Sequence, residues 1–166
     1  MKKRIVLLTM ILFLLIGCNM GNTPTATVEN LFNKYQRLDD DIETGINKVL
    51  DEQNMTSENR TRYYKLLEKQ YRSLSYEIKD EKIDGNIATV IVEIEVIDYK
   101  KTINDLTFDS SIYTKDSFDN EKLNRLENAN DKVTYTLELS LTKDRDDMWK
   151  LDALTNEEIK KIQGMY

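Results

Sequence analysis

The chain has 166 residues, 24 of them basic and 30 acidic, so its formal net charge is −6. Nucleic-acid-binding proteins present clusters of Lys and Arg to phosphate groups, so an acidic chain of this kind is not expected to bind nucleic acid. The chain has no histidine and a single cysteine, Cys18, which excludes an intramolecular disulfide and the Ser–His or Cys–His pairs of nucleophilic catalysis.

The first 17 residues have the pattern of a secretory signal peptide. Lys2, Lys3 and Arg4 form a positively charged segment, and residues 5–16 form an apolar run that only Thr9 interrupts. This run is shorter than the roughly 20 apolar residues that a helix needs to cross a bilayer. The sequence therefore predicts that residues 1–17 are a cleaved leader and not a permanent anchor.

Leu15, Ile16, Gly17 and Cys18 resemble the lipobox of bacterial lipoproteins. The resemblance implies that the signal peptidase recognises Leu15, Ile16 and Gly17, and that Cys18 receives a diacylglyceryl group and becomes the mature N-terminus. Two acyl chains hold a protein stably on a bilayer. We therefore expect a lipid-anchored protein on the extracytoplasmic face of the cell membrane, with residues 18–22 as its tether. The alternative is a free thiol, or a small apolar residue in an uncleaved leader.

The mature part predicted in this way has 149 residues, enough for a single domain with one core. It carries 21 basic and 30 acidic residues, a formal charge of −9. No polybasic segment is available to bind anionic lipid, so the lipid on Cys18 is the expected membrane contact.

Two helices are expected in the first half of this domain. Thr23 and Pro24 have the character of an N-cap and a first helical residue, and apolar residues then recur at steps of three and four as far as Leu50. A second helix is predicted over about 57–72. The acidic run 39–41 is interpreted as a solvated face or a bend, with a cation site as the alternative.

From residue 74 the apolar period changes to two, which predicts strands. A first hairpin is expected around a three-residue loop, 83–85, with Gly85 in the left-handed region, so that Ile78 faces Val90 and Tyr76 faces Val92. A second hairpin is expected from strand 133–141 and a strand that begins at Trp149. A capping box of Thr155 and Glu158 should then begin a short helix that ends near Gly164.

Residues 100–131 form a long connection between the two hairpins. Residues 117–129 have a helical pattern, and the residues before them are expected to be a loop. Connections of this length are uncommon in compact domains and are often functional or mobile.

The element order, together with Thr23–Pro24, the strand run 83–90 and the closing segment 149–152, resembles the nuclear-transport-factor-2-like superfamily. The resemblance extends to small lipoproteins of low-GC Gram-positive bacteria. It implies an α+β fold, the cystatin-like α+β cone, in which helices pack on one curved antiparallel sheet of about four strands. Residues 23–166 would form this single domain, with 100–131 as an insert.

The predicted site is the interior of this cone. Tyr76, Tyr135 and Trp149 are the candidate pocket-lining residues, and no inward carboxylate is placed to act as a base. We therefore expect a binding or interaction module for a small apolar ligand, a peptide or an envelope protein, with no catalytic residue, cofactor or metal. The alternative is an isomerase- or hydrolase-type enzyme in which Tyr76 or Tyr135 donates a proton to an oxyanion.

One acidic cluster also suggests a second, weaker candidate for a cation site. Asp144, Asp146 and Asp147 lie in a predicted turn, where hard cations often find oxygen ligands. The central glycine and closing glutamate of a calcium-binding loop are missing, so a solvated turn is the favoured interpretation.

Overall fold

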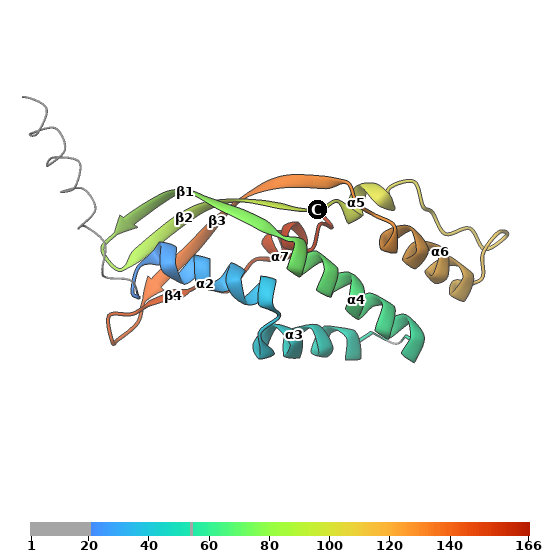
Figure 1. The fold of residues 1–166 in the computed structure, drawn as a ribbon, viewed down its shortest axis with the longest axis horizontal. Helices are drawn as coiled ribbons and strands as arrows, with labels where there is room; N and C mark the ends of the chain where they lie inside the picture. The colour runs from blue at the N-terminus through green and yellow to red at the C-terminus, as the bar shows by residue number, and fades with distance from the viewer. Residues whose placement is uncertain (1–20, 54) are drawn as a thin grey trace, which may run out of the picture.

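The computed structural model describes residues 21–53 and 55–166, so the predicted leader and Cys18 lie outside the described part. The described residues form an α+β fold of six helices and one four-stranded antiparallel sheet, as expected (Figure 1). No helix among them is both long and apolar enough to cross a membrane. The elements in chain order are α2 (Pro24–Arg37), α3 (Asp40–Asp51), α4 (Ser57–Ser73), β1 (Ser75–Asp84), β2 (Ile87–Ile97), α5 (Tyr99–Thr102), α6 (Lys115–Glu127), β3 (Lys132–Lys143), β4 (Trp149–Leu151) and α7 (Asn156–Ile162).

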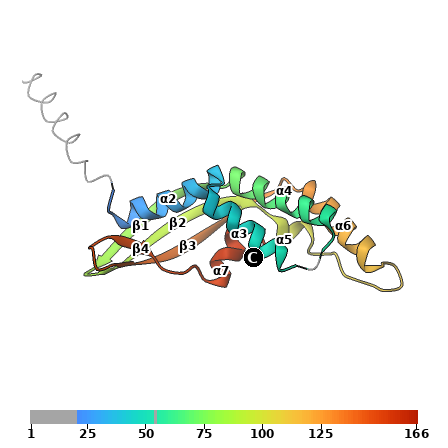
Figure 2. The same cartoon turned by 90° about the horizontal axis from the view of Figure 1, so that it is seen from below.

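The helices lie along one face of a curved sheet whose strand order is β1-β2-β3-β4. Helix α2 contacts β1, β2 and β4, and α4 contacts β2 and also α2, α3 and α6. Figures 1 and 2 show an elongated molecule in which the β1–β2 hairpin and the start of α2 lie at one end and α6 at the other. Helix α6 therefore extends beyond the sheet, and α4 links it to the rest of the fold.

The expectation of one helix from Pro24 to Leu50 is wrong, because the chain turns between α2 and α3. Leu38 adopts a left-handed conformation at φ 56°, and its side chain stays buried at 6% exposure. The N–H of Asp39 donates to the carbonyl oxygen of Lys34 at 3.1 Å, which closes the end of α2. The acidic run 39–41 thus lies at the bend and in the first turn of α3, where Asp41 pairs with Lys34 at 2.7 Å. Beyond the bend, α3 packs against α4.

The first hairpin has a different loop and register from those predicted. Its loop contains two residues, Gly85 and Asn86, and Ile78 faces Val92 instead of Val90. Gly85 has a positive φ of 61°, as expected, at the first central position of the turn. Tyr76 faces Ile94 instead of Val92.

A bulge between Ile78 and Asp80 corrects the face of the strand. Without it, a two-residue loop would bring Ile78 opposite Glu93 and turn the apolar residues of β1 toward solvent. The predicted three-residue loop, 83–85, would avoid this conflict by lengthening the turn. The structure resolves it with one extra residue, Lys79, within the strand.

The main core fills the space between the sheet and the helices. Alternate residues of β2 and β3 face α2 and are nearly inaccessible, and Phe32 of α2 lies against them. These strand residues include Val90, Val92, Leu137 and Leu139, each no more than 1% exposed.

The long connection 100–131 has a buried part and an exposed part. Helix α6 lies two residues further toward the N-terminus than predicted, and its Leu123 and Leu126 form a second cluster with Leu66 and Tyr99. The loop before α6 leaves Phe108 half exposed and Ile112 71% exposed. The helical part therefore belongs to the packed structure.

The C-terminal segment begins and ends as predicted. Thr155 and Glu158 form the capping box of α7, and Gly164 has a positive φ of 67° beyond its end. A Cβ at Gly164 would collide with the carbonyl oxygen of Ile97 and with the side-chain amide of Gln70. Glycine is therefore required here both for its conformation and for the close approach of the two backbones.

Two glycine-to-alanine variants should have opposite effects on stability. Gly164→Ala is expected to lower the free energy of unfolding by about 2 kcal/mol or more, because it combines left-handed strain with a backbone collision. Gly45→Ala, in the interior of α3 with no atom within 4 Å of the new methyl group, should raise it by about 0.5–1 kcal/mol. Chemical denaturation of both variants measures the difference, and a neutral Gly164→Ala would contradict the packing described here.

Candidate binding site

The three residues predicted to line a pocket lie at separate contacts of the core. The ring of Tyr76 stacks on Phe32 with centroids 5.0 Å apart. Tyr135 meets the ring of Tyr166 edge-on at 5.8 Å, and its hydroxyl donates to the carbonyl oxygen of Tyr166 at 3.1 Å. Trp149 is 7% exposed and lies beneath the ammonium of Lys143. The structure does not bring these three side chains together around one cavity.

A cavity of about 510 Å³ instead lies on the helical side of the molecule, toward α6. Its floor is the N-terminal half of α4, and its walls are the end of α3, α6 and the C-terminal tail. This volume falls within the range of about 300–1,000 Å³ that small-molecule sites occupy. The apolar lining residues are Val49, Leu50, Met55, Tyr63, Leu66, Leu67, Tyr99, Leu126 and Met165, and polar groups on the rim include Gln53, Asn59, Lys115, Asp119, Lys122 and Gln163.

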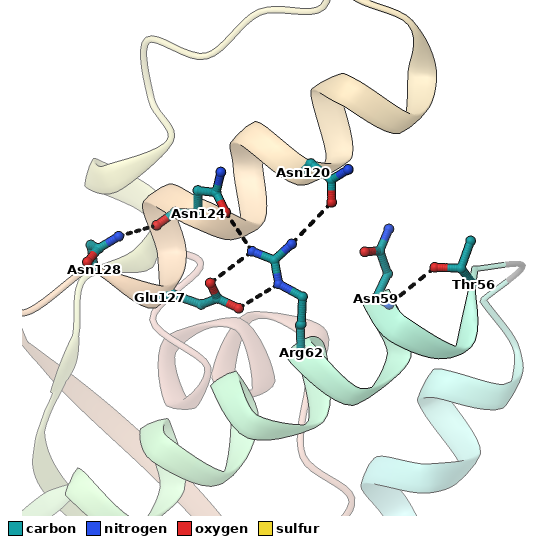
Figure 3. A network of polar contacts seen from close by, with 7 residues as sticks. All are labelled: Thr56, Asn59, Arg62, Asn120, Asn124, Glu127 and Asn128. Atoms are coloured by element: carbon teal, nitrogen blue, oxygen red, sulfur yellow. Dashed lines mark hydrogen bonds and ion pairs between the residues drawn. The ribbon is translucent and has the colours of Figure 1, made fainter.

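An arginine of α4 binds several side chains of α6. Arg62 projects from α4 and donates from Nε and Nη2 to the two carboxylate oxygens of Glu127, at 2.7 and 2.8 Å (Figure 3). Its Nη2 also donates to the side-chain oxygen of Asn124 at 2.7 Å, and its Nη1 to that of Asn120 at 3.1 Å. A bidentate arginine constrains both distance and orientation, so this contact fixes the position of α6 relative to α4.

A lysine of α4 holds the other end of the same interface. The ammonium of Lys69 donates to the carbonyl oxygen of Ala129 at 2.8 Å and to that of Glu127 at 3.3 Å. These carbonyl groups lie at the C-terminal end of α6, where the helix leaves acceptors unpaired and a positive charge is favourable.

Tyr99 closes the inner end of the cavity. Its hydroxyl donates to the carbonyl oxygen of Leu66 at 3.1 Å, and its side chain is buried. Burial raises the pKa of Tyr99 to about 12, so the phenol is neutral at physiological pH. Tyr99 therefore acts as a fixed hydrogen-bond donor to the backbone of α4.

The acidic residues that suggested cation sites have other partners. Asp144 accepts hydrogen bonds from the backbone N–H groups of Asp146 and Met148, at 2.9 and 3.0 Å, and these bonds lower its pKa. They close the turn between β3 and β4. Within residues 21–53 and 55–166, no group of three or more His, Cys, Asp or Glu side chains is placed to hold a metal ion.

A second, more open hollow of about 610 Å³ lies in the exposed loop before α6. Phe108 and Ile112 line it, and the ring of Phe108 meets that of Phe118 edge-on at 5.3 Å. The cavity on α4 is the better candidate for a ligand, because three helices and the C-terminal tail enclose its apolar floor.

Comparison of the chain with protein-family models, with curated proteins and with solved structures finds no match. The resemblance to the nuclear-transport-factor-2-like superfamily therefore stays a prediction.

The Arg62–Glu127 contact predicts a specific pH dependence. The hydrogen bond from Arg62 lowers the pKa of Glu127, so this pair stabilises the folded state above the ordinary glutamate pKa of about 4.3 and is lost as the pH falls through the lowered value. Glu127→Gln is expected to cost about 1 kcal/mol of unfolding free energy at pH 7 and progressively less below pH ~4. Denaturation at a series of pH values measures this difference.

Glu68→Gln is the matched control, because Glu68 makes a single exposed pair with Arg72 on α4. It should cost less than about 0.5 kcal/mol at any pH. Equal effects of the two substitutions at pH 7 would mean that the contact in Figure 3 does not hold α6.

Proposed function

We propose that this protein is a lipid-anchored lipoprotein of the extracytoplasmic face of the cell membrane that binds an apolar ligand in the cavity between α3, α4 and α6. The observation that carries the binding function is the cavity itself, with its apolar floor and its polar rim. The positively charged start, the apolar run 5–16 and the lipobox-like residues 15–18 support the anchor.

The position of residue 22 supports an orientation for the anchored protein. Asn22 donates from its side chain to the carbonyl oxygen of Asp147 at 2.7 Å and accepts from the N–H of Trp149 at 2.9 Å. Only three residues separate Asn22 from Cys18, a span of at most about 14 Å. A lipid on Cys18 would thus hold the β3–β4 turn near the bilayer, while α6 lies at the other end of the molecule (Figures 1 and 2).

Binding is favoured over the enzymatic alternative by the chemistry of the lining. Asp119 is the one carboxylate among the lining residues that the structure describes, and it is partly exposed. The hydroxyl of Tyr99 already donates to the backbone of Leu66. An isomerase- or hydrolase-type mechanism needs a base and a donor directed at the same substrate atoms, and Asp119 is the one candidate carboxylate base among the described lining residues.

The anchor predicts the behaviour of one variant. Cys18→Ser is expected to lose incorporation of a radiolabelled fatty acid and to move from the membrane fraction to the soluble fraction, because serine has no thiol for the diacylglyceryl group. A Gly21→Ser variant, which leaves the lipobox-like residues intact, should keep the label. Label that persists in Cys18→Ser would refute the lipid anchor.

The binding function predicts that a bulky side chain at the cavity mouth blocks an uncharged apolar probe. Val49 lines the cavity and is 48% exposed, so Val49→Trp can cover the floor without disturbing the core. We expect Nile red to bind the purified protein with increased fluorescence, and Val49→Trp to weaken binding at least about tenfold. Ile159→Trp, at an exposed apolar site on α7 outside the cavity lining, is the control and should bind as the unaltered protein does.

A further inference from the structure

The rim of the cavity on α6 carries three charged side chains. Lys115, Asp119 and Lys122 are spaced by four and three residues, which places them on one face of the helix. The ammonium of Lys122 lies 6.0 Å from the centre of the Tyr63 ring, which belongs to the cavity floor. One cation of the rim is therefore held at the border between the apolar lining and solvent.

The two lysines have no carboxylate partner in the part of the chain that the structure describes. The ion pairs among residues 21–53 and 55–166 include neither Lys115 nor Lys122. Two other acids of α6 are paired with arginines, Glu121 with Arg125 at 2.8 Å and Glu127 with Arg62 at 2.7 Å. The rim thus has two cations and one anion, although the chain as a whole is acidic.

The other polar groups of the rim are uncharged. Gln53, Asn59 and Gln163 contribute amides from the segment after α3, from α4 and from the segment after α7. Below them the lining is apolar, with Leu66 and Leu126 at its base only 5% and 4% exposed. A ligand that matches this distribution has an extended apolar body and one anionic group at its outer end.

We infer that the ligand is a single-chain amphiphile with a carboxylate head, a fatty-acid anion, whose alkyl chain fills the cavity and whose head lies between Lys115 and Lys122. This inference rests on the proposed binding function and specifies its ligand class. Charge-assisted hydrogen bonds from the two ammonium groups stabilise the head, and burial of the alkyl chain supplies apolar contact. The negative charge of Asp119 repels the carboxylate head, so the affinity of the protein for the fatty-acid anion is moderate.

The test compares dodecanoate with dodecanol, which has the same chain and an uncharged head, by displacement of Nile red from the purified protein at neutral pH. Dodecanoate is expected to bind at least about tenfold more tightly than dodecanol. Two methylenes fewer, in decanoate, should weaken binding about fourfold for each methylene, which corresponds to ~0.8 kcal/mol per group.

Three variants locate the head group. The double variant Lys115→Gln, Lys122→Gln should reduce dodecanoate affinity to that of dodecanol and leave dodecanol unchanged. Asp119→Asn should strengthen dodecanoate binding by several-fold. This is the opposite of the effect expected for the lysine variant, although all three residues lie on the same face of α6. Lys160→Gln removes an exposed lysine of α7 outside the cavity and should change neither affinity.

The outcomes separate this inference from the proposed function. If Nile red and dodecanol bind and Val49→Trp blocks them, but dodecanoate binds no better than dodecanol, the ligand class is wrong and the binding function stands. Tighter binding of dodecyltrimethylammonium than of dodecanoate would overturn the ligand class in the same way. If neither Nile red nor dodecanol binds, the binding function itself fails.

Discussion

The arrangement of the fold depends on one buried amide, that of Gln70. Its side chain is fully buried on α4, accepts from the N–H of Ile97 at 3.0 Å, and donates to the carbonyl oxygens of Ile97 at 3.1 Å and Ile162 at 3.4 Å. It thereby joins α4 to the end of β2 and the end of α7, and Gly164 lies against it. Without it the backbone groups of Ile97 would be buried and unpaired, which costs more than the bond contributes. Gln70 thereby holds together three parts of the cavity wall: α4, the residues that follow β2, and the C-terminal tail.

Much of the fold could be predicted from the sequence, because the apolar period distinguishes strands from helices and the caps mark where helices begin. Thr23, Thr155 and Gly85 act as their types and positions indicate. The details that were missed depend on contacts between elements. A bulge at Lys79 and a longer loop both restore the buried face of β1, and the strand pattern alone cannot choose between them. The left-handed turn at Leu38 is fixed by burial of its side chain, which propensity does not reveal.

The candidate site was harder to predict, because it is formed by helices that meet only in three dimensions. The strand alternation placed Tyr76, Tyr135 and Trp149 on the inner face of the sheet. Side chains of α2 and of the C-terminal tail pack against that face, among them Phe32 on Tyr76 and Tyr166 on Tyr135. One signal was present: Asn120, Asn124 and Glu127 recur at helical spacing as a polar stripe on α6. A stripe of this kind could have indicated docking against a cation, although only the structure identifies that cation as Arg62.

The position of the cavity follows from where the sheet ends. Over β2 and β3 the strand side chains and Phe32 exclude solvent, so a ligand could enter only by displacing well-packed core residues. Helix α6 extends beyond the sheet, and there the smaller cluster around Leu123 supports the helices from one side. Leu66 of α4 and Leu126 of α6 belong to this cluster and also line the cavity, and the Arg62–Glu127 contact fixes the two helices beside them. The polar contact that fixes α6 therefore also fixes the position of the α6 residues that line the cavity.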